Sequence, residues 1–197
     1  MAERPEVLIL RHGQTEWNAA GRYQGSRDSP LTTLGRDQAR AQGAILAALG
    51  ARLRGFDLRV SPQGRALETA ALALAPLGLT ARPDPRLREI AVGAWEGLTR
   101  AEIAARYPLQ DDDHFWWMDA APGGEGHDAV AARSAELLAG LTGPTLLFTH
   151  GMTAGHLRAA LRGLSRSALA GLDHRQGVVW RIAGGREEIW SSPGQAG

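Results

Sequence analysis

The sequence predicts an α/β fold in three layers, in which helices cover both faces of a parallel-rich central sheet. Short apolar segments of strand length alternate along the chain with longer segments of helical periodicity. The first of them, Val7-Leu8-Ile9-Leu10, is apolar at every position, which is typical of a parallel strand buried on both faces. The 197 residues contain neither an internal repeat nor a linker, so we expect a single domain over residues 1–197.

The helix expected after this strand covers residues 33–49. Its apolar positions recur at helical spacing, so they form one stripe that would face the sheet. Gly50 follows as the residue that ends the helix. The stripe consists of Leu34, Ala41, Ile45 and Leu49.

A second strand, residues 58–61, leads directly into a second helix that extends to about Pro76. Ser61 is expected to be the N-cap of this helix, because a hydroxyl can accept from the free N–H groups of the first turn. Pro62 would be the first helical residue, where proline fits best.

A third helix begins at Thr99, which has capping-box spacing to Glu102, and ends before Pro108. Residues 145–149 are apolar and predict another buried strand. The remaining expected elements are a short strand at 79–82, helices at 128–141 and 152–161, and a hairpin of 178–182 with 187–190 around Gly184-Gly185.

Residues 108–127 are polar, aromatic and glycine-rich, and predict a long loop. The run Asp111-Asp112-Asp113-His114 lacks the ligand spacing of a metal site, so a solvated acidic loop is the preferred interpretation. The run Phe115-Trp116-Trp117 fits either a small core beneath the loop or the apolar wall of a substrate pocket.

Composition excludes several kinds of chemistry. The chain has no Cys, which excludes disulfides, thiolate zinc sites and cysteine nucleophiles, and it has no Lys, which excludes a Walker A loop. A net charge of +1 gives no reason to expect nucleic-acid binding. There is no apolar run of membrane-spanning length and no secretory apolar segment, so we expect a cytoplasmic protein with no membrane partner.

Cationic and imidazole side chains follow three of the expected strands. The first strand ends in Arg11-His12-Gly13, the second is followed by Arg65, and the strand at 145–149 is followed by His150. In open α/β sheets, ligands bind at the carboxyl ends of the strands. Arginine presents a planar fork of donors that suits phosphate, and histidine can act as nucleophile, acid or cation near neutral pH. The sequence therefore predicts a site for a phosphoryl group, with Asn18 as a further donor.

A carboxylic acid near such a site could donate a proton to a leaving oxygen. Glu16, Glu89 and Glu96 are all candidates, and their spacing does not choose among them.

With these residues the chain resembles the histidine phosphatases, the phosphoglycerate-mutase-like superfamily, from Val7 to about Ile182. The pattern that carries the resemblance is Arg-His-Gly-x-Thr-x-x-Asn at residues 11–18. Supporting matches are Gln24-Gly25, Leu31-Thr32, Ser61-Pro62 with Arg65-Ala66, Glu89 with Trp95-Glu96-Gly97, and Thr149-His150-Gly151. The resemblance implies a phosphoglycerate-mutase-like fold and the phosphatase branch of the superfamily.

The resemblance also implies a role for each matching residue. His12 would be the nucleophile that takes the phosphoryl group, and Glu89 would be the general acid and base. No metal and no cofactor are implied. The residues expected to hold the phosphoryl oxygens are Arg11, Arg65 and His150, and those expected to line the substrate pocket are Asn18, Gln24, Gly25 and Gly151.

Three positions depart from the pattern of the family. Gly126 stands where many relatives carry Ser, and Arg175-Gln176 precede the late strand where relatives commonly place Asn. The Arg often found five residues after the second histidine is missing, because Gly155 is there, and Arg158 comes later. These departures leave the choice of substrate open.

The preferred function is hydrolysis of a small phosphorylated metabolite. The nearest alternative is a phosphoglycerate mutase, but residues 90–97 are more typical of the phosphatase branch. A noncatalytic phosphate-binding module and a metal-dependent hydrolase are further candidate functions. The sequence does not fix the oligomeric state, and a homodimer is one possibility.

Overall fold

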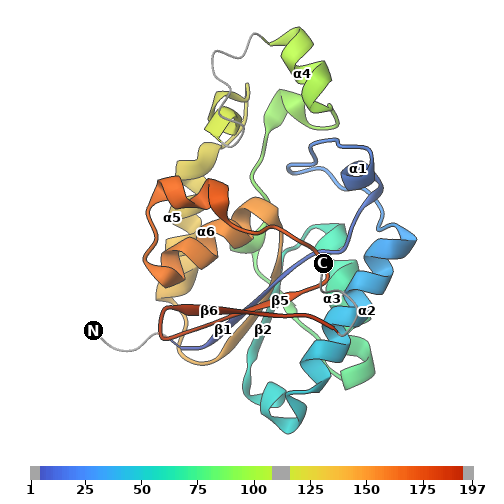
Figure 1. Cartoon of the computed structure of the whole chain (residues 1–197), viewed down its shortest axis with the longest axis vertical. Coiled ribbons are helices and arrows are strands. Elements are labelled where there is room, and N and C mark those ends of the chain that lie inside the picture. The colour runs from blue at the N-terminus through green and yellow to red at the C-terminus, as the bar shows by residue number, and fades with distance from the viewer. Residues whose placement is uncertain (1–4, 108–115, 193–197) are drawn as a thin grey trace.

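A mixed six-stranded sheet forms the centre of the computed structural model, which describes residues 5–107 and 116–192 (Figure 1). The order of the strands is β3-β2-β4-β1-β5-β6. The first four are parallel, and β5 and β6 form an antiparallel hairpin at one edge. The strands are β1 (Val7–Arg11), β2 (Asp57–Val60), β3 (Arg82–Pro83), β4 (Thr145–Thr149), β5 (Val179–Ala183) and β6 (Arg186–Trp190).

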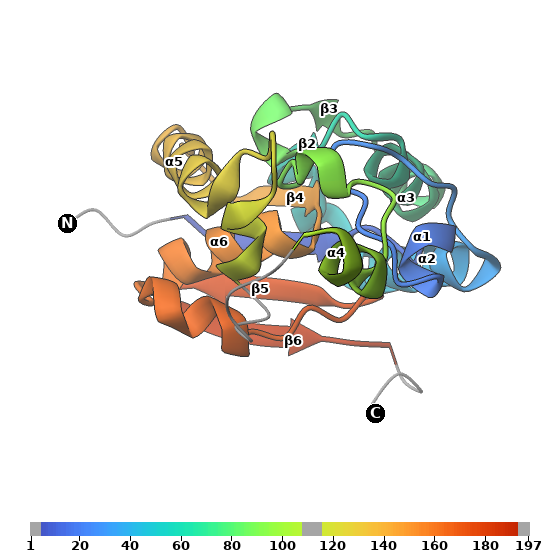
Figure 2. The same cartoon turned by 90° about the horizontal axis from the view of Figure 1, so that it is seen from above.

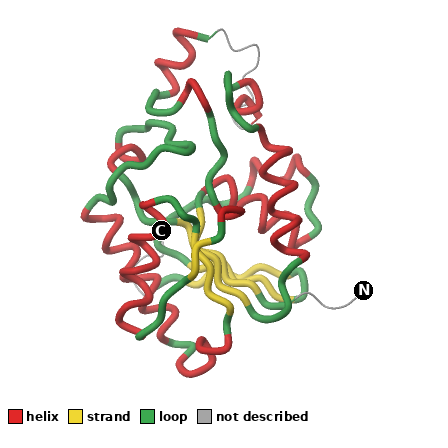
Figure 3. The backbone as a smooth tube through the Cα atoms, turned by 180° about the vertical axis from the view of Figure 1, so that it is seen from behind, coloured by secondary structure: helices red, strands yellow, loops and turns green. Residues whose placement is uncertain are grey.

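Helices cover both faces of this sheet, and Figure 3 shows the strands lying between helices on either side. None of the helices in the described ranges has the length and apolar character needed to cross a bilayer. The α-helices are α1 (Glu16–Ala19), α2 (Thr33–Ala47), α3 (Gly64–Leu74), α4 (Arg100–Arg106), α5 (Gly126–Ala139) and α6 (Gly151–Arg162). Short 3-10 helices occupy Gly50–Gly55, Ala75–Leu77, Pro85–Leu87, Gly93–Trp95, Trp116–Ala120 and Arg166–Gly171.

The alternation of side chains along β1 divides the core into two parts. Leu8 and Leu10 point into a cluster beneath α2 and α3, whereas Val7 and Ile9 point into a cluster beneath α5 and α6. All four side chains are fully buried. The three-layer, parallel-rich arrangement predicted from the apolar segments is therefore confirmed.

A third apolar cluster lies outside the two sheet layers. Trp95 and Trp117 stack with ring centroids 4.6 Å apart, and Ile103 of α4 packs against them. Figure 2 looks down on α4. Trp117 therefore belongs to a small separate core, one of the two interpretations of the aromatic run. Phe115 and the acidic run 111–114 lie outside the described residues.

The stripe predicted for the first long helix is wrong. Leu34 is 51% exposed, and the residues that α2 buries are Gly35, Ala39, Gln42, Gly43 and Leu46. The reason is the short distance between α2 and α3: a Cβ added at Gly43 would lie 2.6 Å from the carbonyl oxygen of Ala73. Only the face with the small residues can come this close, so Ile45 and Leu49 pack at the margin of the cluster.

The predicted N-cap of the second helix is also wrong. α3 begins at Gly64 after Gln63, and Asp28 accepts the N–H groups of Gly64 and Arg65 at 2.6 and 3.2 Å. Ser61 bonds instead to the imidazole of His150, which lies 2.7 Å away.

The remaining expected elements are present with small shifts of their ends. The capping box of Thr99 and Glu102 is confirmed, and the hairpin turns through Gly184 and Gly185, which both have positive φ. The strand expected at 79–82 is reduced to the two residues of β3.

Two glycines hold the end of β1 against the start of α2. A Cβ at Gly13 would lie 2.1 Å from the carbonyl oxygen of Gly35, and one at Gly35 would lie 2.0 Å from that of Gln14. Real side chains do not fit into such a contact between two backbones, so both positions require glycine. This contact fixes the segment that follows Arg11 and His12.

We expect Gly35→Ala to destabilise the protein by at least about 2 kcal/mol, because an overpacked backbone contact must open. Gly143→Ala is the control, since a Cβ there has no neighbour within 4 Å and its φ is not positive. Urea titration gives the free energy of unfolding of both variants. Equal stability of the two would show that the contact is not tight.

Candidate active site

A pocket of about 350 Å³ lies at the carboxyl ends of β1 and β4. Eight of the nine predicted site residues line it: Arg11, His12, Asn18, Gln24, Gly25, Arg65, Glu89 and Gly151. The ninth, His150, is fully buried beside the pocket, with its ring centroid 5.1 Å from that of His12. The other lining residues are Gly21, Arg22, Tyr23, Ile90, Val92, Met118, Met152 and His174.

His12 follows β1 and is held in one orientation. Its Nδ1 lies 2.8 Å from the carbonyl oxygen of Gly13, which can only accept, so Nδ1 carries the proton and Nε2 carries the lone pair. Burial lowers the pKa of His12 well below its usual value, and the charges of Arg11 and Arg65 lower it further. The imidazole is therefore neutral at neutral pH and available as a nucleophile.

Arg65 lies in the first turn of α3 and is almost completely buried. Its guanidinium donates to the carbonyl oxygens of Gly25 and Arg27 at 2.9 and 2.6 Å and to Asp28 at 2.7 Å. Arg11, at the end of β1, donates to the carbonyl oxygen of His174. These bonds hold two cations in one pocket.

Each of the two guanidinium groups has one N–H donor that no acceptor in the described residues bonds to. The Nε atoms of Arg11 and Arg65 are buried, and no acceptor in the described parts of the chain lies within hydrogen-bond distance of either. A buried donor normally has a partner, and a buried charge needs one. Two such cations in one pocket, beside a helix N-terminus, favour a bound anion with several oxygens.

His150 lies between the anion pocket and the sheet. Its Nε2 bonds to Ser61, and its buried Nδ1 has no partner among the residues that the structure describes. Burial and the charge of Arg65 lower the pKa of His150 well below its usual value. The imidazole is thus neutral, with Nε2 held by Ser61 and the buried Nδ1 without a partner among the described residues.

Glu89 lies at the N-terminus of α6, in the wall of the pocket that holds the two arginines. Its Oε1 accepts the N–H groups of Ile90 and Thr153 at 3.0 and 3.1 Å and lies 3.2 Å from the Thr153 hydroxyl. Its Oε2 accepts a single N–H, from Met152 at 3.1 Å. Oε1 is therefore the more firmly anchored of the two oxygens, and Oε2 accepts fewer hydrogen bonds.

The geometry distinguishes the three glutamates that residue spacing left as candidates for the general acid. Glu16 is exposed on α1, and Glu96 accepts from the N–H and hydroxyl of Ser26 at 2.8 and 2.7 Å. Neither lines the pocket, whereas Glu89 does. A Cβ at Gly25 would lie 2.4 Å from Oε1 of Glu96, so Glu96 supports the turn at Gly25 from behind.

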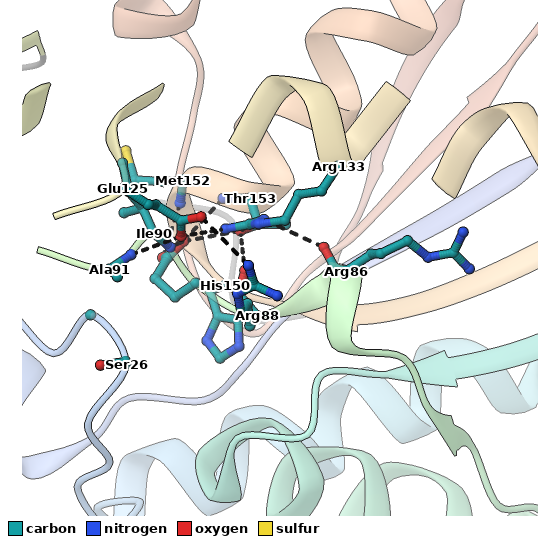
Figure 4. A network of polar contacts seen from close by, with 12 residues as sticks. Ser26, Arg86, Arg88, Ile90, Ala91, Glu125, Arg133, His150, Met152 and Thr153 are labelled. Atoms are coloured by element: carbon teal, nitrogen blue, oxygen red, sulfur yellow. Dashed lines mark hydrogen bonds and ion pairs between the residues drawn. The ribbon is translucent and has the colours of Figure 1, made fainter. Parts of the chain in front are cut away.

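A second charged network joins Glu125, Arg133 and Thr153 (Figure 4). Its member Thr153 also contacts Glu89. Glu125 accepts from Arg133 and from the N–H of Ala91, both at 2.9 Å, and Arg133 also reaches the Thr153 hydroxyl at 3.4 Å. Thr153 in turn donates to the carbonyl oxygen of Arg88 at 2.7 Å. The network ties α5, α6 and the segment around Glu89 together.

Asn18 and Gln176 connect the first strand to the segment before β5. Asn18 completes a capping box with Thr15, and its Oδ1 accepts from Gln176 at 3.2 Å. Gln176 also donates to the carbonyl oxygen of His12 at 2.9 Å. Asn18 lines the pocket, and because its Oδ1 already accepts hydrogen bonds, its amide N–H groups are the polar atoms left to donate.

Arg158 does not take the place of the missing arginine. It is buried, pairs with Glu187 at 2.7 Å and stacks on Trp180 at 4.4 Å, and it does not line the pocket. The segment between α6 and β5 contributes His174 to the pocket instead, which no local pattern predicts. The pocket also contains three residues that the sequence does not predict as lining it, namely Arg22, Tyr23 and Met118. The first two directly precede Gln24, which the sequence does predict.

The described residues contain no cluster of three or more His, Asp or Glu side chains placed to hold a metal ion. The acidic run 111–114, the stretch for which the sequence raised a metal site, lies outside those residues.

Comparison with known proteins gives consistent matches. The family model of the histidine phosphatase superfamily (branch 1) matches residues 7–191. Glucosyl-3-phosphoglycerate phosphatase of Mycolicibacterium vanbaalenii is 39% identical over 80% of this chain and 74% of its own length. A protein of Yersinia pestis named probable phosphoglycerate mutase GpmB is 35% identical over 83% of this chain and 77% of its own.

Solved structures agree with these matches. A mycobacterial glucosyl-3-phosphoglycerate phosphatase in complex with VO3 superimposes with a TM-score of 0.78 and 34% identity, covering 96% of this chain and all of the other. Bacillus stearothermophilus YhfR gives a TM-score of 0.78 and 32% identity over 95% of this chain and 96% of its own.

We expect Arg65→Lys to weaken the binding of inorganic phosphate at least tenfold, a loss of about 1.4 kcal/mol. Lysine lacks both the fork and the Nε donor, so it cannot bond to the carbonyl oxygens and to a phosphate at once. Calorimetry measures the dissociation constant, with Arg54→Lys on the exposed surface as the control. Unchanged affinity of the Arg65 variant would place the anion elsewhere.

Proposed function

The chain belongs to the histidine phosphatase superfamily (branch 1) and is a phosphomonoester hydrolase, and we propose that its reaction proceeds through a covalent phosphohistidine at His12. One observation carries the proposal. His12 has a fixed tautomer with a free Nε2, and it lies in the same pocket as two buried arginines with spare donors. Binding of phosphate alone requires neither that nitrogen nor an acid beside it, so a noncatalytic phosphate-binding module is the weaker interpretation.

In the first step, Nε2 of His12 attacks phosphorus in line with the bond to the leaving oxygen. The new P–N bond forms as this P–O bond breaks, and the proton on Oε2 of Glu89 goes to the departing alkoxide. In the second step, water attacks phosphorus and gives its proton to the same carboxylate. The P–N bond breaks, His12 recovers its lone pair, and inorganic phosphate leaves.

The surrounding donors stabilise the charge that develops on the phosphoryl group. A phosphoryl transition state spreads negative charge over three equatorial oxygens, so fixed donors around it are the main source of catalysis. Arg11, Arg65 and His150 fill this role in the proposal, with Asn18 as a further donor. The mechanism requires no metal ion and no cofactor.

The substrate in this proposal is a small phosphorylated metabolite. A pocket of about 350 Å³ accommodates a phosphate and a moderately large alcohol. Relatives named glucosyl-3-phosphoglycerate phosphatase make that compound the first to assay. A relative named as a phosphoglycerate mutase keeps 3-phosphoglycerate isomerisation as the second assay.

The phosphoenzyme is the first test. Enzyme quenched with alkali during turnover should carry a phosphoryl group that is stable to base and labile to acid, and mass spectrometry should place it on His12. His12→Ala should lose the label and the activity together. A label that persists in this variant, or that maps to His150, would falsify the proposal.

The role of Glu89 is tested by the leaving group. An alkoxide needs a proton as the P–O bond breaks, whereas an activated phenolate needs little help. Glu89→Gln should therefore slow the phosphorylation of His12 by an alkyl phosphate at least tenfold more than phosphorylation by p-nitrophenyl phosphate. Single-turnover kinetics isolates this step from the later attack of water. Glu16→Gln, exposed on α1 and outside the pocket, is the matched control, and equal slowing with both substrates would assign Glu89 to binding.

A further inference from the structure

Gln63 is a buried polar residue that bonds to two pocket residues and has no role in the proposed mechanism. It immediately precedes α3, and only 8% of its surface is exposed. Its Nε2 donates to the carbonyl oxygen of Gly25 at 2.8 Å, and its Oε1 accepts the N–H of Glu89 at 2.7 Å. One side chain therefore joins the turn at Gly25 to the segment that carries Glu89.

The two partners fix the orientation of this amide. A carbonyl oxygen can only accept and a main-chain N–H can only donate, so Nε2 must face Gly25 and Oε1 must face Glu89. A flipped amide would place oxygen against oxygen and N–H against N–H, and both hydrogen bonds would be lost. Because a buried amide without partners is costly, Gln63 holds its two partners at a fixed separation.

The main chain around Glu89 is held from three elements. Thr153 of α6 and Glu125, which directly precedes α5, bond to the main chain of residues 88–91 at 2.7 and 2.9 Å. Gln63 adds a bond from the start of α3. Of these three contacts, it is the one that connects the segment of Glu89 to the helix whose first turn carries a pocket arginine.

The carbonyl oxygen of Gly25 is an acceptor that Gln63 shares with this arginine. Arg65 donates to it at 2.9 Å, and Gln63 donates at 2.8 Å. A carbonyl oxygen has two lone pairs, so it can accept both bonds. The guanidinium of Arg65 and the amide that holds Glu89 are thus positioned against the same atom.

We propose that Gln63 is a positioning residue, which places the main chain of Glu89 relative to Arg65 so that the carboxyl group can protonate the leaving oxygen. The proposal rests on the proposed function and adds to it a residue that does not touch the substrate. Catalysis is sensitive to small displacements of a reacting group. A shift of the Glu89 segment should therefore slow the reactions that need the acid and spare those that do not.

Gln63→Met tests the proposal, because methionine has a similar size but can make neither bond. In single-turnover experiments, phosphorylation of His12 by an alkyl phosphate should slow at least about fivefold more than phosphorylation by p-nitrophenyl phosphate. The dissociation constant of inorganic phosphate should change less than about threefold, because Arg65 still holds the carbonyl of Gly25. A merely structural role would slow both substrates equally.

Two further variants at this position separate the two bonds. Gln63→Glu keeps an oxygen that can accept the N–H of Glu89, so it should recover most of the leaving-group selectivity. It loses the donor to Gly25 and should weaken phosphate binding instead. Gln63→Asn is one methylene shorter and cannot bond to both partners at once. It should show the selective slowing as well, and it replaces Gln63→Met if thermal unfolding shows that the methionine variant does not fold.

Gln42→Met is the matched control. Gln42 is a fully buried glutamine of α2 whose amide donates to the carbonyl oxygens of Arg11 and Val178 at 2.9 and 3.1 Å. These partners belong to β1 and to the residue before β5, so its loss does not act through the general acid. Any slowing in this variant should be the same for the alkyl and the aryl phosphate.

A double-mutant cycle tests whether Gln63 acts through Glu89. Once Glu89→Gln has removed the acid, adding Gln63→Met should slow the alkyl phosphate little further. Full additivity of the two changes would overturn the proposal, and so would equal slowing of both substrates by Gln63→Met or no slowing of either. Failure of the proposed function has a different signature, namely a wild-type enzyme that forms no phosphoenzyme at His12.

Discussion

Two positive charges buried at one edge of the sheet are the constraint on which the rest of the site depends. A guanidinium leaves water only where acceptors replace its hydration. Arg65 obtains them from Gly25, Arg27 and Asp28, and Arg11 from the carbonyl oxygen of His174. The chain after β1 must therefore pass along the start of α3, and the chain before β5 must reach across to β1. The hydrogen bonds that these two buried guanidinium groups require therefore constrain the course of both loops.

The same charges help to determine the protonation state of the two nearby imidazoles, His12 and His150. Burial and the arginines together lower the pKa of His12 and of His150, so both rings stay neutral, and His12 keeps the lone pair that the proposed mechanism needs. The positive field that favours an anion also preserves the lone pair of His12 that attacks phosphorus in the proposed mechanism. Glu89 is balanced separately, by backbone N–H groups at the N-terminus of α6, where the helix dipole favours a carboxylate.

Much of this arrangement could be predicted because the relevant residues are contiguous. Arg11 and His12 directly follow an apolar strand, and His150 directly follows another, so local pattern and the edge rule for parallel sheets bring them together. Where a contact between distant segments determines the role of a residue, the local sequence pattern predicts that role wrongly. Ser61 has the features of an N-cap, but its hydroxyl bonds to His150, 89 residues away.

Some features have no local signal at all. The buried face of α2 is set by how closely α3 approaches, which makes Gly43 a core position and leaves Leu34 exposed. His174 and Gln176 come from a segment without periodicity, and their roles depend on where β5 places them. The choice of Glu89 over Glu96 rests on position around the pocket, which residue spacing does not contain.

The hydrogen bond from Gln176 to the backbone of His12 has a consequence for the order of events during synthesis. It joins residues 164 positions apart, near the two ends of the fold. A chain emerging from the ribosome folds its N-terminal parts first, and contacts of such separation are the last to form. His12 thus leaves the ribosome early but acquires its final surroundings only when β5 docks beside β1. A nascent chain that still lacks this strand contains His12 without the surroundings in which it would act as the proposed nucleophile.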